Sequence, residues 1–143
     1  MLQINPISNF NNQINFNGKF KKSYALSKAI EKADKYDLEK FDEFLKRMSK
    51  TDDRRLFEMH SIIENNYGRQ FHMVNLKEYK MRYNSNTVEN MKINRLSDKD
   101  YEDIAYRGVL AKLNNILEGI YPDNKAGNID KKTLIENIYK QLS

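Results

Sequence analysis

The first half of the chain repeats its apolar residues every three or four positions, the spacing of one helix face. This spacing predicts a helix that begins after Ser23, a serine suited to cap the first helix turn. A second helix is predicted over about 37–50, with Lys46, Arg47 and Lys50 at its C-terminal end, where cations are favourable.

The segment 51–68 fits two kinds of element. The acidic pair after Thr51 suits the first turn of a helix, and Gly68 suits a left-handed residue at its end, so we expect a third helix. Phe57, Met59 and Ile63 also alternate with other residues, which leaves a strand over 56–63 as the competing interpretation.

Beyond Gly68 the apolar positions alternate with a period of two, as in a strand with one apolar face. The alternating residues are Phe71, Met73, Tyr79, Met81 and Tyr83. We predict a β-hairpin over about 70–83 and 87–95, with a turn at 84–86. Because a lone hairpin is unstable in water, this apolar face is expected to pack on the helices.

Two further helices are predicted after the hairpin. The first begins at Ser97, which with Asp100 imitates a capping box, and it ends at Pro122. The last begins near Asp130 and buries apolar residues up to Leu142. The expected fold class is therefore α+β and mostly helical, with three N-terminal helices, one β-hairpin and two C-terminal helices.

An Asn-rich segment, residues 1–22, precedes a single expected globular domain over 23–143. Its polar density is typical of a disordered tail. The alternative is a docking segment whose apolar side chains bind a partner protein or the body of the chain itself. The candidate contacts for partner docking are Ile4, Ile7, Phe10, Ile14 and Phe16.

Composition narrows the chemistry that this chain can perform. The absence of Cys excludes disulfide scaffolds, zinc fingers and thiol nucleophiles, and the scattered glycines fit no nucleotide-binding loop, so no cofactor is expected. Neither a transmembrane run nor a signal peptide is evident, which favours a cytoplasmic protein. The net charge is +5, but frequent Lys and Asn also reflect AT-rich codons, so charge is a weak guide to partners.

The predicted hairpin concentrates positive charge among tyrosines, a combination that can neutralise phosphates and stack on bases. The candidate nucleic-acid-binding residues are Arg69, Lys77, Lys80, Arg82, Lys92 and Arg95. Two observations weigh against this interpretation. The alternation places the tyrosines on the apolar face, and a basic strand face also keeps an ordinary sheet soluble.

Two sets of residues suggest metal chemistry. His60 and Glu64 share a face if they lie on a helix, and His72 could complete a metal site from the hairpin. Glu64 together with Glu78 and Lys80 resembles the acidic residue and Glu-x-Lys core of restriction-type nucleases, which implies Mg²⁺ on the carboxylates and a lysine that assists water. The ordinary alternatives are a His–Glu pair and cross-strand charge pairing.

The hypothesis that we favour from sequence is a small non-catalytic interaction protein that binds an unknown protein partner. Nucleic-acid binding through the basic hairpin is the alternative, and a metal-dependent nuclease is a third. The sequence indicates neither the partner nor the oligomeric state.

Overall fold

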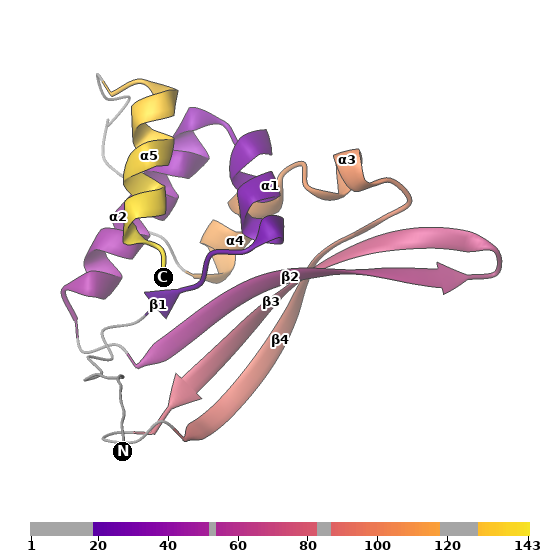
Figure 1. The fold of residues 1–143 in the computed structure, drawn as a ribbon, viewed down its shortest axis with the longest axis horizontal. Helices are drawn as coiled ribbons and strands as arrows, with labels where there is room; N and C mark the ends of the chain where they lie inside the picture. The colour runs from indigo at the N-terminus through magenta and orange to yellow at the C-terminus, as the bar shows by residue number, and fades with distance from the viewer. Residues whose placement is uncertain (1–18, 52–53, 83–86, 118–128) are drawn as a thin grey trace, which may run out of the picture.

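A mixed four-stranded sheet, with helices packed on one face, forms the described part of the chain (Figure 1). The computed structural model describes residues 19–51, 54–82, 87–117 and 129–143. In chain order the elements are β1 (Lys19–Phe20), α1 (Tyr24–Lys32), α2 (Lys35–Ser49), β2 (Arg55–Asn66), β3 (Arg69–Met81), β4 (Val88–Lys99), α3 (Glu102–Ala105), α4 (Val109–Ile116) and α5 (Lys131–Gln141). The strands lie in the order β1-β2-β3-β4; β1 is parallel to β2, and the other pairs are antiparallel.

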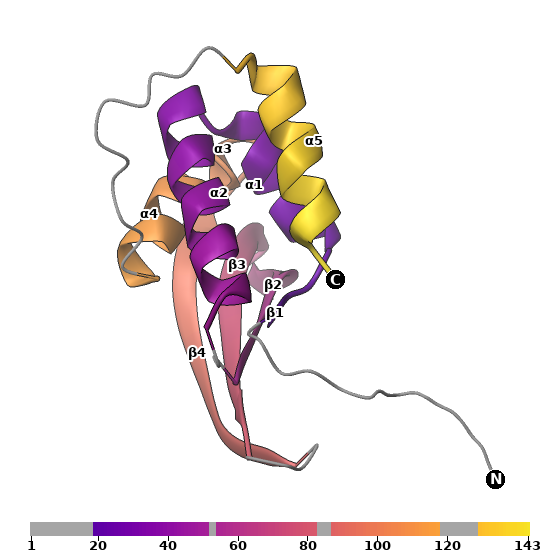
Figure 2. The ribbon, with the colours of Figure 1, turned by 90° about the vertical axis from the view of Figure 1, so that its left-hand side faces the viewer.

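The helices form a layer over one side of the sheet (Figure 2). α1 packs on β2, α4 packs on β4, and α5 packs on α2. Beyond this layer the β2–β3 hairpin extends as an arm (Figure 1), and its residues 61–70 are exposed. The sheet therefore has one face that is largely covered by helices and one that carries none of the described helices.

Side-chain caps set the starts of α1, α2 and α5, and Ser23 is the cap that the sequence predicts for the first of them. The Ser23 hydroxyl accepts a hydrogen bond from the Leu26 amide at 3.1 Å. The Asp130 carboxylate accepts one from the Thr133 amide at 2.8 Å, and Asp34 does the same for α2. Each cap satisfies an amide that has no partner within its own helix, so the predicted helices near 23–33, 37–50 and 130–142 are confirmed.

The strand β1 joins the start of the described chain to the core. Phe20 is fully buried; its ring stacks on Phe57 at 5.5 Å and meets the ring of Phe41 edge-on at 5.2 Å. The C-terminal residue lies alongside, since the Ser143 amide donates to the Phe20 carbonyl at 3.0 Å. Phe20, which belongs to the segment predicted as a tail, is thus part of the core.

The predicted third helix is wrong, because this segment is the strand β2. Its residues pair with β3 along the whole hairpin, from Arg55 opposite Lys80 to Asn66 opposite Arg69. The backbone φ is +53° at Tyr67 and +76° at Gly68, as in a type I′ hairpin turn. Gly68 is left-handed as predicted, but it closes a hairpin instead of ending a helix, and the competing strand interpretation is the correct one.

The region after the hairpin also differs from prediction. Ser97 lies in β4, so it does not begin a helix. The helical segment that follows is broken into α3 and α4, and Gly108 lies between them with φ of +71°. The α+β class is confirmed, but "mostly helical" with three N-terminal helices and a single hairpin is wrong: two helices precede strands of 12, 13 and 12 residues.

Candidate interaction surface

The two faces of the sheet are assigned by strand register. Met59 lies opposite Leu76 in the β2–β3 ladder, and both are fully buried in the core with Phe57 and Val74. Since successive side chains alternate between faces, the odd-numbered residues of β3 lie on the side without helices. We call that side the open face.

The predicted orientation of the hairpin is therefore reversed. Phe71, Met73, Tyr79 and Met81 were expected to pack on the helices, but they alternate with Val74 and Leu76, which fill the core instead. Met73 is nevertheless buried, with Ile62 opposite it on β2 and Asp98 opposite it on β4. Tyr83, the fifth member of the predicted face, lies outside the described residues. Both faces of β3 are apolar, and the residues of the helix layer and β2 determine which one is covered.

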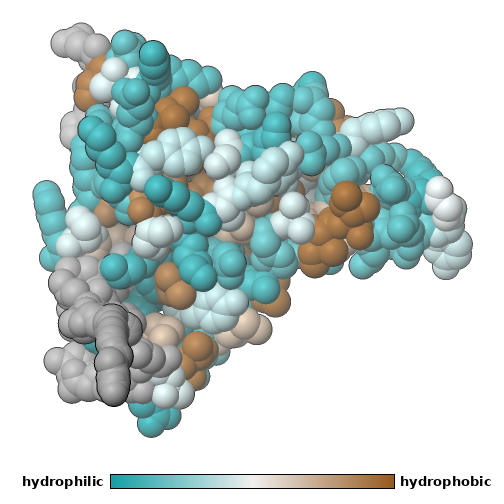
Figure 3. Space-filling model, viewed as in Figure 1, coloured by the Kyte–Doolittle hydropathy of each residue, from teal (hydrophilic) through white to brown (hydrophobic). Residues whose placement is uncertain are grey.

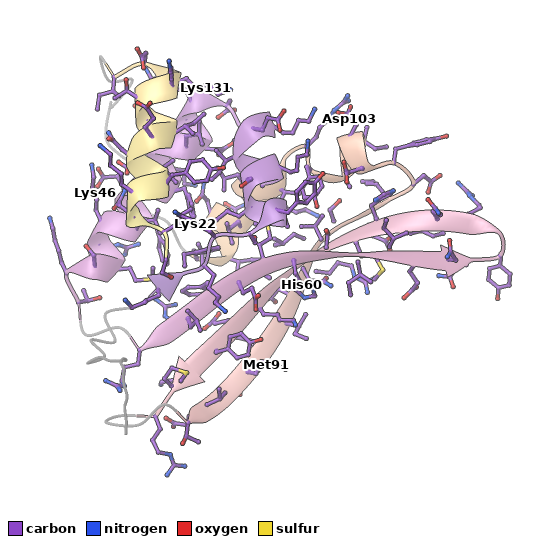
Figure 4. All side chains as sticks on the ribbon, in the orientation of Figure 1. Lys22, Lys46, His60, Met91, Asp103 and Lys131 are labelled. Carbon is purple, nitrogen blue, oxygen red and sulfur yellow. The ribbon has the colours of Figure 1, made fainter. Side chains whose placement is uncertain are left out.

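Apolar side chains gather on the open face near the β3–β4 end of the sheet. Leu56 lies opposite Tyr79, and Tyr79 lies opposite Met91, so one row crosses three strands. Ile93 follows on β4, and 54% of its surface is exposed, against 50% for Met91. We call Leu56, Tyr79, Met91 and Ile93 the open-face patch. Met91 is labelled in Figure 4, away from the helices, and Figure 3 shows hydrophobic areas among polar residues on the sheet.

Charged and polar residues continue the open face beyond the patch. The next rows place Glu58 opposite Lys77, and His60 opposite Asn75. Burial lowers the pKa of His60, and the positive charge of Lys77 lowers it further, against the opposing effect of Glu58. The His60 Nε2 atom is buried without a hydrogen bond among the described residues. The His60 imidazole is therefore held toward its neutral form.

The six basic residues predicted to bind nucleic acid do not lie on one face. Lys77 and Arg95 belong to the open face, whereas Lys80 and Lys92 point to the other side, where Glu78 lies opposite Lys92. Two of the six basic residues form ion pairs within the chain. Arg69 pairs with Asp100, and Arg95 Nη1 lies 3.4 Å from Asp98 Oδ2. Arg82 follows the end of β3, and its carbonyl accepts a hydrogen bond from Arg54. The positive charge is thus divided between the two faces.

The residues that resemble a nuclease core are separated in the structure. Glu64 lies opposite Phe71, seven residues along β3 from Glu78, which corresponds to about 23 Å along the strand. Glu64 belongs to the open face and Glu78 to the opposite face, so alternation directs the two carboxylates away from each other. Glu78 and Lys80 do share a face, as the sequence predicts for neighbours two positions apart on a strand.

The candidate metal ligands are also dispersed. His60 and Glu64 lie on one face of β2, four residues and about 13 Å apart. His72 belongs to the opposite face of β3, in a hollow that it shares with Asp100 and Glu102. Within residues 19–51, 54–82, 87–117 and 129–143, no group of three potential ligands is placed to hold a metal ion.

The predicted docking residues Ile4, Ile7, Phe10, Ile14 and Phe16 lie outside the described residues. Among the described helices, none is long and apolar enough to span a membrane. The open face is the feature that sequence reasoning missed. The sequence feature that could have indicated it is a second apolar pair on β3, Val74 and Leu76, since only one of the two apolar sets of this strand can face the helices.

Comparisons with known protein families, curated proteins and solved structures found no significant match to this chain.

Proposed function

We propose that this chain is a non-catalytic protein-binding module, and that its open-face patch binds the apolar stripe of an amphipathic helix from a partner protein. The observation that carries the proposal is the row Leu56–Tyr79–Met91 with the adjacent Ile93. These side chains form an apolar area with a charged margin, and such areas mark protein interaction sites more often than chance exposure does.

The width of the patch favours a helix as the bound element. The row from Leu56 to Met91 crosses two interstrand spacings, or about 10 Å, which is close to the diameter of a helix with its side chains. The opposite face of the same strands already packs helices through Met59, Leu76 and Leu96. A partner helix on the open face would give the sheet the second covering layer typical of apolar sheet faces.

The arrangement of the other candidate residues favours binding over the alternatives. Of the residues proposed for metal chemistry, His60 and Glu64 lie on the open face and His72 and Glu78 on the opposite face, and the basic residues are also divided between faces. Nucleic-acid binding stays a prediction from sequence, with no structural observation in its favour. Docking of a partner by residues 1–22 also stays a prediction.

The test is affinity purification from the source cells with quantitative mass spectrometry. The variant Tyr79→Ser with Ile93→Ser removes two apolar side chains from the patch. Its matched control is Tyr24→Ser with Tyr36→Ser, two exposed apolar residues on the helical layer. We expect one protein to be captured by the wild type and the control but lost with the patch variant. Equal capture by both double variants would overturn the proposal.

Binding of a helix is tested on the protein identified in this way. Peptides that cover its sequence are titrated against the full chain, and circular dichroism follows their structure. We expect a peptide with an apolar i, i+3, i+4, i+7 stripe to bind and to gain helicity. Binding confined to a peptide that stays extended would contradict the helical partner.

A further inference from the structure

The two edge strands of the sheet differ in length and in how far other segments cover them. The strand β1 has two residues, and the C-terminal Ser143 lies against it, hydrogen-bonded to Phe20 and Lys22. The strand β4 forms the other edge; it is 12 residues long, and its ladder with β3 is regular over 90–95, with a register shift on either side of that run. Its residues 88–93 are all exposed, and among the described residues no segment other than β3 forms a backbone hydrogen bond with them. The regular run 90–95 of this edge is a template for pairing with another strand.

We infer that two copies of this chain pair through β4, antiparallel, about a two-fold axis that passes through Lys92. Such an axis is perpendicular to the sheet, so the open faces of both copies lie on the same side. Residues on either side of Lys92 then face each other. Met91 of each copy lies opposite Ile93 of the other, and Glu89, which lies at the register shift between Lys80 and Met81 of β3, comes opposite Arg95.

This register is self-complementary, because every favourable pair forms twice. The two Glu89–Arg95 pairs join opposite charges, and the two Met91–Ile93 pairs bury side chains that are 50% and 54% exposed in the single chain. Moving the axis by one residue removes the match. About residue 91, Glu89 would lie opposite Ile93; about residue 93, Met91 would lie opposite Arg95.

The one unfavourable contact of this register is moderated within each copy. Lys92 would lie opposite Lys92 of the other copy, and like charges directly opposite are destabilising. Each Lys92, however, already lies opposite Glu78 in the β3–β4 ladder. The row across the axis therefore reads Glu78, Lys92, Lys92, Glu78, and each lysine has one acidic neighbour.

Pairing in this register would extend the binding surface as well as close the edge. The two open-face patches would meet at Met91 and Ile93, with Leu56 and Tyr79 at either end. The inference goes beyond the proposed function: it relies on the backbone of the edge and the charges of Glu89 and Arg95, and it shares only Met91 and Ile93 with the open-face patch. Leu56 and Tyr79 would touch no residue of the second copy in this register.

Charge exchange across the axis tests the register. The mass of the full chain is measured by sedimentation equilibrium for the wild type, Glu89→Arg, Arg95→Glu and the variant with both changes. Each single variant places like charges together twice, so we expect its dimer Kd to rise roughly tenfold or more. The double variant restores both pairs and is expected to return toward the wild-type Kd.

The control for altered net charge is Lys112→Glu, an exposed position on α4. It matches Arg95→Glu in charge change and is expected to leave the Kd unchanged. The double variant also controls for the Arg95–Asp98 contact, which is lost in both variants that lack Arg95. A wild-type chain that stays monomeric at high micromolar concentration would overturn the inference, as would a double variant no better than the single ones.

Cysteine substitution tests the position of the axis, because the chain contains no Cys of its own. Directly opposite residues of an antiparallel pair have Cα atoms about 4.5–5.5 Å apart, within disulfide range. We expect Lys92→Cys to form a disulfide-linked dimer on mild oxidation. Asn90→Cys is the control, because its copies would lie about 13 Å apart along the strand. Equal cross-linking of both variants would contradict the register.

Because Ile93 belongs to both surfaces, the charge variants are used to separate the edge from the open face. Glu89→Arg changes the β4 edge but leaves all four side chains of the open-face patch in place. If this variant stays monomeric and still captures the partner, binding through the open face is supported independently of dimerisation. Conversely, a dimer in the predicted register together with equal capture by the Tyr79→Ser, Ile93→Ser variant and its control would refute the proposed function alone.

Discussion

Replacing Leu76 and Ile62 by alanine tests which face of the sheet forms the core. Both substitutions remove three carbon atoms, and the two residues lie on neighbouring strands but opposite faces. Leu76 is fully buried, whereas 46% of Ile62 is exposed. With Met73 and Tyr79 against the helices instead, Leu76 would lie on the side without helices, and its replacement would cost no more than that of Ile62, which belongs to the exposed arm in either orientation. The pair of variants therefore distinguishes the two orientations.

The expected magnitudes follow from burial. Three buried carbons contribute about 2.4 kcal/mol of transfer free energy at about 0.8 kcal/mol each. The cavity left in the core raises the cost of Leu76→Ala to about 3 kcal/mol. For Ile62→Ala only about half of the transfer free energy applies, roughly 1.3 kcal/mol, and solvent fills the space. We expect a difference of about 2 kcal/mol in the free energy of unfolding.

Urea unfolding followed by far-ultraviolet circular dichroism measures this difference. The protein concentration is kept low enough that the midpoint does not depend on it, so association makes no contribution. Met59→Ala, on the buried face of the same strand as Ile62, serves as a control and is expected to resemble Leu76→Ala. If Ile62→Ala costs as much as Leu76→Ala or more, the assignment of the faces is refuted.

Three further variants test local features by the same unfolding assay. Ser23→Ala removes the cap of α1 and is expected to cost about 1 kcal/mol; no loss would mean that the Leu26 amide does not need this bond. Gly68→Ala meets no nearby atom but strains a residue with φ of +76°, so a loss of about 1 kcal/mol is expected, and a neutral result would contradict the turn. The pKa of His60 is lower in the folded chain than the value of 6.5 expected for the unfolded chain. As the pH falls below 6.5, the unfolded chain therefore binds a proton at His60 more readily than the folded chain does. The contribution of His60 to stability is thus present above pH 6.5 and is lost as the pH falls. His60→Gln should therefore reduce the loss of stability from pH 7 to 5, and an unchanged pH profile would refute this role.

Helices whose boundaries depend on neighbouring residues were predictable from sequence. Ser23 and Asp130 cap helices through amides three residues away, and the apolar stripes of α1, α2 and α5 repeat within a few turns. The strand β2 was not predictable in this way. Its start and end resemble helix caps, and its strand conformation depends on pairing with β3, whose residues lie up to 25 positions away at Arg55–Lys80.

The candidate surface was also only partly predictable from the sequence. The sequence identified the basic residues of the hairpin and the alternation that includes Tyr79 and Met81. It did not indicate that the structure would divide these charges between two faces, or that Glu64 and Glu78 would be separated by most of a strand. Spacing along the chain specifies which residues share a face of one element, but distances between elements depend on register.

The amino-acid sequence alone determines the α+β character of this protein, its capped helices and the hairpin of β3 and β4. Tertiary structure selects the face of that hairpin that becomes the core, since Val74 with Leu76 and Tyr79 with Met81 are both apolar sets of similar strength. The physical reason is that burial depends on long-range partners. Phe57 and Met59 on β2, together with the helices above them, complete a core on only one side, and the remaining apolar side chains are left on the open face.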